Sequence, residues 1–264
     1  MNMDERSTTS TIRSVDKALE VLEAFSEISG GIKLSRLSER LDMNRSGVHR
    51  LLQVFKQRGY IEQKQKNGKY HLGMTAYTLG QNIVSNMEIM RMAGAVMEGL
   101  VRDYNETVYL AVRCDQDVLF FENAGSLHPV NVMALKGRRY PLVECAAGEM
   151  LQAFGMVPEE DDLCEPFENH AHLARLKQQG YSTDAHRLGE GVISLAVPLL
   201  NAEKVAVGSL CFVGPESRFT EEKIKGSLLP PLIDAGHAVS AQLGYYGYTL
   251  VKSRLTRRQF NTKG

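Results

Sequence analysis

The sequence has no tryptophan, only four cysteines, and no apolar run long enough to cross a membrane. A membrane-spanning helix needs about 20 apolar residues, and the longest apolar runs, such as residues 192–200, have less than half that length. The N-terminal residues MNMDERSTTSTIRS carry acids where a secretory signal has bases, and no apolar core follows them. These absences predict a cytoplasmic protein with no membrane partner.

Cysteine and proline are both scarce. Four cysteines (Cys114, Cys145, Cys164 and Cys211) without CxxC spacing are too few for a disulfide scaffold in a chain of this length, so we expect reduced thiols. Only 8 prolines, with 43% hydrophobic and 23% charged residues, exclude a fibrous or extensively disordered chain. A globular chain of 264 residues has room for two modest domains joined by a linker.

Net charge is also absent, because 31 basic and 31 acidic residues cancel. The charge is nevertheless polarised along the chain: residues 44–70 carry seven bases and one acid, whereas residues 76–251 carry 13 bases and 22 acids. A basic segment in front of an acidic body is typical of a polyanion-binding module attached to a domain with another task. A solvated lysine-rich surface is the alternative.

Amphipathic helices are expected in the first sixty residues. Apolar residues recur at helical spacing in 14–26, with Ser14 as N-cap, and in 35–42, with Ser35 as N-cap. After a short break, Asn44 is placed to cap a third helix. Two helices joined by a tight turn predict a helix-turn-helix, with the third helix of the chain as its recognition helix.

The third helix has two distinct faces. Its apolar stripe consists of Val48, Leu51, Leu52 and Phe55, whereas Arg45, Ser46, His49, Arg50 and Gln53 fall on the other side. Such polar and basic side chains can reach base edges and phosphates from the major groove. A module that binds only protein partners remains the alternative.

A wing is expected after Gly59. Residues 60–63 and 69–72 are predicted to form strands around the hairpin signal Asn67-Gly68, with lysines near the turn. The complete predicted set of DNA-binding residues is Ser35, Arg45, Ser46, His49, Arg50, Lys64, Lys66 and Lys69.

The order IRSVDKALEVLEAF, LSRLSERLDMNRSGVHRLLQVFKQRGYIEQ and GKYHLG resembles the N-terminal winged helix-turn-helix domain of the IclR family of bacterial transcription regulators. The resemblance implies a DNA-binding domain over residues 12–74 and double-stranded operator DNA as partner. Family members typically have a Ser-Thr pair in the recognition helix where this chain has Ser46-Gly47, so one hydroxyl for a phosphate contact is missing.

Residues 75–104 have the apolar pattern of one long or two successive helices, rich in methionine. They are either core helices or a connector that packs against a second copy. The resemblance implies a helical linker and dimerisation segment at 75–92, and a homodimer or a dimer of dimers.

The remaining chain predicts an α+β domain with a mostly antiparallel sheet. Strands are expected at 107–114, 117–124, 130–135, 192–199 and 205–213, and helices at 146–154, 171–179 and from 220 onward. The segments GRRYPLVECAAGEML, QQGYSTDAHRLGEGVISLAVPL and GSLCFVGPESRFTEEKI resemble the GAF-like effector-binding domain of the same family. This implies an effector-binding domain at 93–248, followed by a basic tail at 249–264.

A ligand site is expected where a helix begins at Ala146, because unpaired backbone N–H groups at a helix start attract a carboxylate. By resemblance, the effector-binding residues are Met133, Ala146, Ala147, Asp184, Ser194 and Cys211. Ser194 stands where many members have Cys, and Cys211 and Val213 stand where some have Ser. Fewer hydroxyls along the last strand imply a more apolar pocket, which favours an aromatic or longer-chain acid as the effector.

No catalytic or metal-ligating constellation is evident. His170 and His172 lack a further ligand at metal-binding spacing, so we predict no metal and no cofactor. The sequence therefore predicts a DNA-binding transcription regulator, a repressor, that is controlled by a small carboxylic acid and is not an enzyme. The alternative is a thiol-responsive regulator or small-molecule enzyme centred on Cys145, whose position before a helix could lower its pKa.

Overall fold

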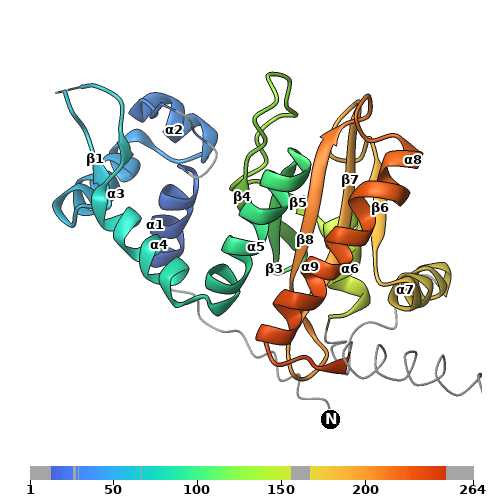
Figure 1. Cartoon of the computed structure of the whole chain (residues 1–264). Helices are drawn as coiled ribbons and strands as arrows, with labels where there is room; N and C mark the ends of the chain where they lie inside the picture. Colours follow the sequence, from blue (N-terminus) through green and yellow to red (C-terminus); the bar gives the residue numbers. More distant parts are fainter. Residues whose placement is uncertain (1–12, 26–27, 29, 66, 156–166, 248–264) are drawn as a thin grey trace, which may run out of the picture. The chain divides into compact units, whose positions relative to one another are not determined.

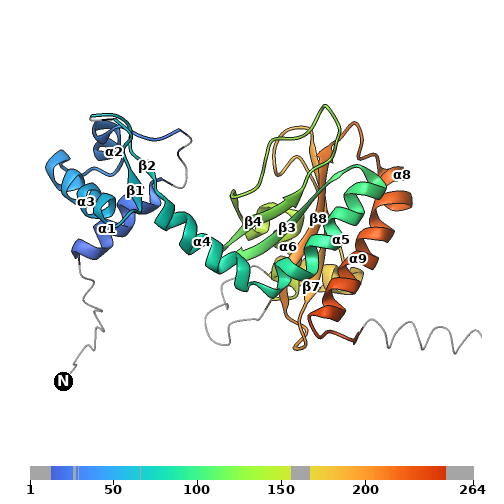
Figure 2. The same ribbon diagram turned by 60° about the vertical axis from the view of Figure 1, so that its left-hand side comes forward.

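The computed structural model describes residues 13–25, 28, 30–65, 67–155 and 167–247 (Figures 1 and 2). Contacts divide the chain into two compact units that meet between Asn86 and Met87, inside the segment 75–92 that was expected to be a linker. In the described part of the chain, no helix is both long and apolar enough to span a membrane.

The N-terminal unit consists of helices and a small two-stranded sheet. Its elements are α1 (Arg13–Glu23), α2 (Leu34–Arg40), α3 (Arg45–Gln57), β1 (Ile61–Glu62), β2 (His71–Leu72) and α4 (Met74–Asn86). The core lies between α1, α2, α3 and the sheet, and it contains the fully buried Val21, Leu37, Val48 and Leu52. Ile32 adds an antiparallel bridge to Tyr70, which fixes the segment before α2 against the sheet.

Two predicted helix caps are wrong. Ser14 lies inside α1, which begins at Arg13 at the edge of the described residues. Ser35 lies inside α2, whose N-cap is Lys33 without a side-chain hydrogen bond. The reason for the second difference is the bridge of Ile32, because the extended segment ends at Lys33 and the helix starts directly after it.

The wing differs from the predicted hairpin. Its strands pair over only two residues each, with Ile61 opposite Leu72 and Glu62 opposite His71. The eight residues 63–70 therefore connect the strands, in place of a two-residue turn. Asn67 still has a positive φ of 64°, and the amide of Gly68 donates to the carbonyl of Gln65 at 2.8 Å.

The C-terminal unit is a six-stranded antiparallel sheet with helices on both faces. Its elements are α5 (Glu88–Tyr104), β3 (Thr107–Cys114), β4 (Asp117–Ala124), β5 (Arg139–Pro141), α6 (Ala146–Ala153), α7 (Phe167–Gln179), β6 (Ser182–Ala185), β7 (Val192–Leu200), β8 (Ala206–Pro215), α8 (Glu221–Lys223) and α9 (Leu229–Gln242). The strand order is β5-β4-β3-β8-β7-β6. Helices α5 and α9 pack on one face, and α6 packs on the other (Figure 2).

Packing on both faces explains the continuous apolar runs of β7 and β8. Along β8, Leu210 and Phe212 belong to the core beneath α5 and α9, whereas Cys211 and Val213 belong to the core beneath α6. Alternate side chains of a strand point to opposite faces, so a sheet that is covered twice needs apolar residues at every position.

The strand predicted at 130–135 is wrong. This segment is irregular, and Val130 and Met133 are 69% and 51% exposed, so its apolar residues do not form a core strand. The edge of β4 pairs with β5 in its place, Val118 lying opposite Tyr140. Neither β5 nor β6 was predicted.

Candidate nucleic-acid interface and effector pocket

Asn44 determines where α3 begins. Its side-chain oxygen accepts a hydrogen bond from the amide of Gly47 at 2.6 Å and another from the Ser46 hydroxyl at 3.0 Å, which confirms the predicted N-cap. A Cβ atom added at Gly47 would lie 2.9 Å from the same Asn44 oxygen. Gly47, which stands where the family typically has a residue with a hydroxyl, therefore leaves room for the Asn44 side chain that caps the helix.

A groove of about 600 Å³ lies between α2, α3 and the wing, and we call it the α3 groove. Its polar lining comes from Lys33 and Ser35 near the start of α2, from Arg45, His49, Gln53 and Lys56 of α3, and from Gln63 and Asn67 of the wing. Three predicted DNA-binding residues, Ser35, Arg45 and His49, thus line one concave surface. Lys56 lines it too, although the prediction did not include it.

The other predicted DNA-binding residues are distributed around the α3 groove. Ser46, Arg50 and Lys64 are exposed but do not line the groove. Lys69 is exposed and lines a second cavity, which Arg36 and Arg40 of α2 also line. Lys66 lies outside the described residues.

Two contacts orient the side chains of the α3 groove. His49 Nε2 lies 3.2 Å from the side-chain nitrogen of Gln53, one turn along the helix. Arg45 forms an ion pair with Glu39 at 3.7 Å, and both side chains are about 70% exposed. An ion pair as exposed as this contributes little to stability, so Arg45 remains available to a phosphate or a base.

Most of the residues expected to bind the effector lie near the start of α6. Ala146 donates its backbone N–H to Asp184 Oδ2 at 2.7 Å, and the Ser194 hydroxyl donates to the same oxygen. Asp184 is only 5% exposed, and its other oxygen, Oδ1, has no hydrogen-bond partner among the residues that the structure describes. The expectation of an unpaired N–H at Ala146 is therefore wrong, because the chain's own carboxylate occupies it.

Burial raises the pKa of Asp184, although hydrogen bonds from Ser194 and Ala146 and the positive charge of Arg187 oppose the effect. Five of the six predicted effector residues share this region. Asp184 and Ser194 are joined to Ala146 by hydrogen bonds, and Ala146, Ala147 and Cys211 are fully buried in one core cluster. Met133 does not join them. It lines a separate cavity of about 320 Å³ beside Leu135 and the loop 188–192.

Glu149 is a buried acid that sequence reasoning missed. It accepts a hydrogen bond from Ser182 of β6, and its Oε1 lies 2.8 Å from Nη1 of Arg187 and 3.2 Å from Nε2 of His172. The acid thus joins α6 to α7, β6 and the loop after β6. No local pattern indicates this network, because its members lie 23 to 38 residues from Glu149.

Cys145 does not have the properties of a reactive thiol. It is fully buried, and burial, with the nearby acids Asp184 and Glu149 contributing, raises its pKa to about 12. Its sulfur caps α6 by accepting from the amide of Gly148 at 3.4 Å. Desolvation thus outweighs the helix start that was expected to lower the pKa, and the thiol-centred alternative loses its physical basis.

Two family models match the chain. The model of the IclR helix-turn-helix domain matches residues 14–65, and the model of the bacterial transcriptional regulator IclR C-terminal domain matches residues 81–241. The chain belongs to the IclR family of bacterial transcription regulators. This assignment confirms the expected fold class and the DNA-binding helix-turn-helix domain of an IclR-type regulator.

Several known IclR-family proteins are similar over most of their length. HTH-type transcriptional regulator KdgR of Escherichia coli is 28% identical over 261 residues, which cover 94% of this chain and 98% of the relative. Transcriptional repressor IclR of E. coli is 23% identical, covering 82% and 85%. The solved structure of an IclR homolog from Microbacterium hydrocarbonoxydans, complexed with 4-hydroxybenzoate, has a TM-score of 0.70 at 22% identity, covering 87% and 98%.

Proposed function

We propose that this IclR-family regulator is a cytoplasmic repressor that binds a palindromic operator as a homodimer or dimer of dimers and releases it when a small organic acid binds to the C-terminal unit. The observation that carries the proposal is the α3 groove, where polar and basic side chains of α3 meet the start of α2 and the wing. A recognition helix in the major groove needs such an arrangement of base-reading and phosphate-binding groups.

Arg45, Ser46, His49 and Arg50 are proposed to contact base edges and adjacent phosphates from the N-terminal half of α3. Ser35, Lys64, Lys66 and Lys69 are proposed to contact the backbone at the start of α2 and along the wing. Contacts of the first kind determine which sequence is bound, and contacts of the second kind add affinity that falls with salt.

The proposed effector site is the region around Asp184. The carboxylate of the effector would accept the hydrogen bonds that the Ala146 N–H and the Ser194 hydroxyl donate to Asp184 in this structure. Burial raises the pKa of Asp184, which favours its neutral form and so weakens the repulsion that a second carboxylate would meet. Ala147 and Cys211 belong to the apolar core beside Ala146 and would surround a ligand there with apolar atoms, and the bound 4-hydroxybenzoate of the Microbacterium homolog supports an aromatic acid.

Control of DNA binding requires that the effector bind one arrangement of the chain better than another. We propose that the helical segment 75–92, which contains the boundary between the two units, transmits this preference to the DNA-binding domains of the dimer. Two such domains would read half-sites about one helical turn apart.

A two-stage experiment tests this function with the full chain. First, duplexes bound from a random library are sequenced, and we expect enrichment of a palindrome whose affinity falls by about 1–3 kcal/mol in Arg50→Ala. Second, mono-, dicarboxylic and aromatic acids, including 4-hydroxybenzoate, are screened for release of that duplex. An acid that releases it from the wild type but not from Ser194→Leu supports the effector site.

Lack of enrichment of any duplex would contradict operator binding. Release of the duplex by an acid from both the wild type and Ser194→Leu would contradict the effector site alone. A duplex that no acid releases would limit the proposal to operator binding.

A further inference from the structure

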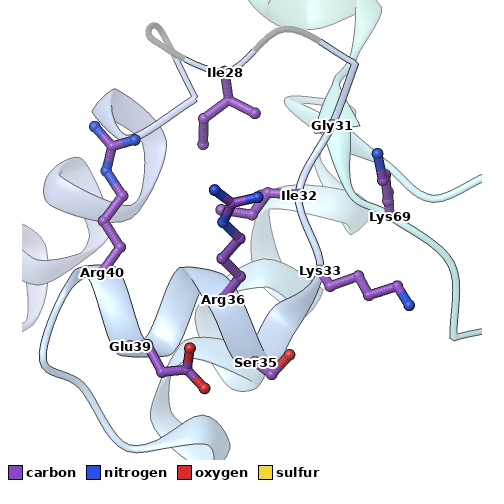
Figure 3. Close-up of a pocket in the computed structure, with 9 residues that line it drawn as sticks. All are labelled: Ile28, Gly31, Ile32, Lys33, Ser35, Arg36, Glu39, Arg40 and Lys69. Atoms are coloured by element: carbon purple, nitrogen blue, oxygen red, sulfur yellow. The ribbon is translucent and has the colours of Figure 1, made fainter.

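A second cavity of the N-terminal unit does not belong to the α3 groove. It has a volume of about 920 Å³, and Arg36, Glu39 and Arg40 of α2 line it (Figure 3). Its apolar floor contains Ile28 and Ile32, and Arg36 and Arg40 rise beside them from successive turns of α2. Lys69 rises from the opposite wall, which belongs to the wing segment. We call this cavity the α2 groove.

The α2 groove is electropositive. Four of its nine lining residues are basic, and all four are exposed: Lys33, Arg36, Arg40 and Lys69. Glu39 is its one acid, and Glu39 is paired with Arg45 of the α3 groove. Among the described residues, the side chains of Lys33 and Arg36 have no hydrogen-bond or ion-pair partner. Lys33 and Arg36 therefore present positive charge that no acid of the described residues neutralises.

The two grooves are continuous at the start of α2. Lys33 and Ser35 line both of them, and Lys33 points away from Arg36 in Figure 3. A polyanion that leaves the α3 groove past Lys33 and Ser35 reaches Arg36 and Lys69 next. A polyanion with charges along its length fits this path better than a compact anion does, because the basic residues of the protein are distributed along the path.

We propose that the α2 groove binds a second stretch of the sugar-phosphate backbone of the same DNA duplex that α3 reads, with Arg36 as its principal phosphate contact. This inference rests on the proposed function, and it adds residues that face away from the bases. Arginine matches a phosphate with two parallel hydrogen bonds, and the apolar floor at Ile28 and Ile32 suits the carbon atoms of the sugars. The contact contributes affinity without sequence preference.

The test measures how the affinity of the full chain for a fluorescein-labelled duplex of random sequence depends on potassium chloride concentration. Each phosphate contact that is lost reduces the slope of log affinity against log salt by about 0.9. We expect this reduction in Arg36→Gln and twice the reduction in Lys33→Gln/Arg36→Gln. Arg139→Gln is the matched control, because it removes an exposed arginine from β5 of the other unit and should leave the slope unchanged.

The outcomes separate this proposal from the proposed function. If the wild type binds the duplex and Arg36→Gln has the same slope as Arg139→Gln, the α2 groove proposal is wrong and operator binding stands. If the wild type has no salt-dependent affinity, both fail.

A thermal-shift measurement with inorganic phosphate distinguishes a site for free anions. If phosphate stabilises the wild type but not Arg36→Gln, while the DNA slopes agree, the groove binds a free anion and the proposal is overturned. Equal circular dichroism spectra and melting temperatures of the variants show that the fold is unchanged.

Discussion

Asp184 occupies the position at the start of α6 where an incoming carboxylate was expected. Its Oδ2 accepts from Ala146 and Ser194, whereas Oδ1 has no hydrogen-bond partner in the described part of the chain. Residue types alone place an acid near this helix, but they do not show that the acid itself holds the N–H. The raised pKa of this residue links the stability of the C-terminal unit to pH, and in the function that we propose the same residue takes part in ligand binding.

Asp184→Asn tests the link to pH. The folded state raises the pKa of Asp184 above its usual value of about 3.9, so the folded state binds the proton more tightly than the unfolded state. Relative to Asp184→Asn, which keeps the accepting oxygen but cannot ionise, the wild type should lose stability as pH rises through that raised pKa.

Denaturation of both proteins between pH 4 and pH 8 measures this difference. Asp115→Asn, in the exposed turn between β3 and β4, controls for the loss of one negative charge. A difference between the wild type and Asp184→Asn that does not change with pH would show that Asp184 is ionised equally in both states.

Cys145 should resist alkylation in the folded protein. With a pKa of about 12, only about one molecule in ten thousand carries the thiolate at pH 8, and burial blocks the reagent. Mass spectrometry after iodoacetamide treatment should find the partly exposed Cys114 labelled long before Cys145. In guanidinium chloride, where burial is lost, Cys114 and Cys145 should be labelled at similar rates. Fast labelling of Cys145 in the native protein would instead support the thiol-centred function.

At the scale of elements, α3 is determined by local signals. Asn44 caps it, and Val48 and Leu52 bury its apolar face as the spacing predicts. The wing is different, because its strands pair over two residues each and the bridge of Ile32 to Tyr70 adds a third segment from before α2. That bridge joins residues 38 positions apart, so no local pattern indicates it.

Asn44→Ala should destabilise the N-terminal unit by about 1 kcal/mol, because the Gly47 amide loses its hydrogen-bond acceptor. Scanning calorimetry of the full chain measures the loss. Asn44→Asp keeps an acceptor at the same place and should retain most of the stability. Equal losses in the two variants would mean that the side chain contributes by something other than capping.

At the scale of the whole molecule, the homodimer that we propose would cover exposed apolar residues of α4. None of its residues is buried, and Met74, Tyr77, Leu79 and Ile83 are 49% to 70% exposed. Leu79 and Ile83 are one turn apart and therefore share a helix face. A helix with this much exposed apolar surface is stabilised when a second copy covers it, which agrees with the homodimer that we propose.

Ile83→Lys should shift the chain from dimer toward monomer, because it places a charge in the apolar face of α4. Sedimentation equilibrium distinguishes the 29.4 kDa chain from a particle of twice that mass. Gln81→Lys introduces the same charge at an exposed polar position of α4 and should leave the dimer intact, so that the particle keeps twice the mass of the chain. A dimer that persists in Ile83→Lys would place the interface elsewhere.

The sequence by itself determined the parts of this protein that depend on local chemistry. Helical spacing and the Asn44 cap predict α3, and β3 and β4 have the bounds that their apolar patterns predict. The family also follows from the sequence, since its motifs extend over most of the chain.

Only the tertiary structure decided what depends on contacts between distant segments. It placed Asp184 on the amide of Ala146, 38 residues away, and it joined Arg187 to Glu149. It also paired β5 and β6 with the sheet edges, although both are too short for a periodic pattern. Desolvation at Cys145 arises in the same way, because burial by the surrounding core sets the pKa of a thiol more strongly than its position before a helix.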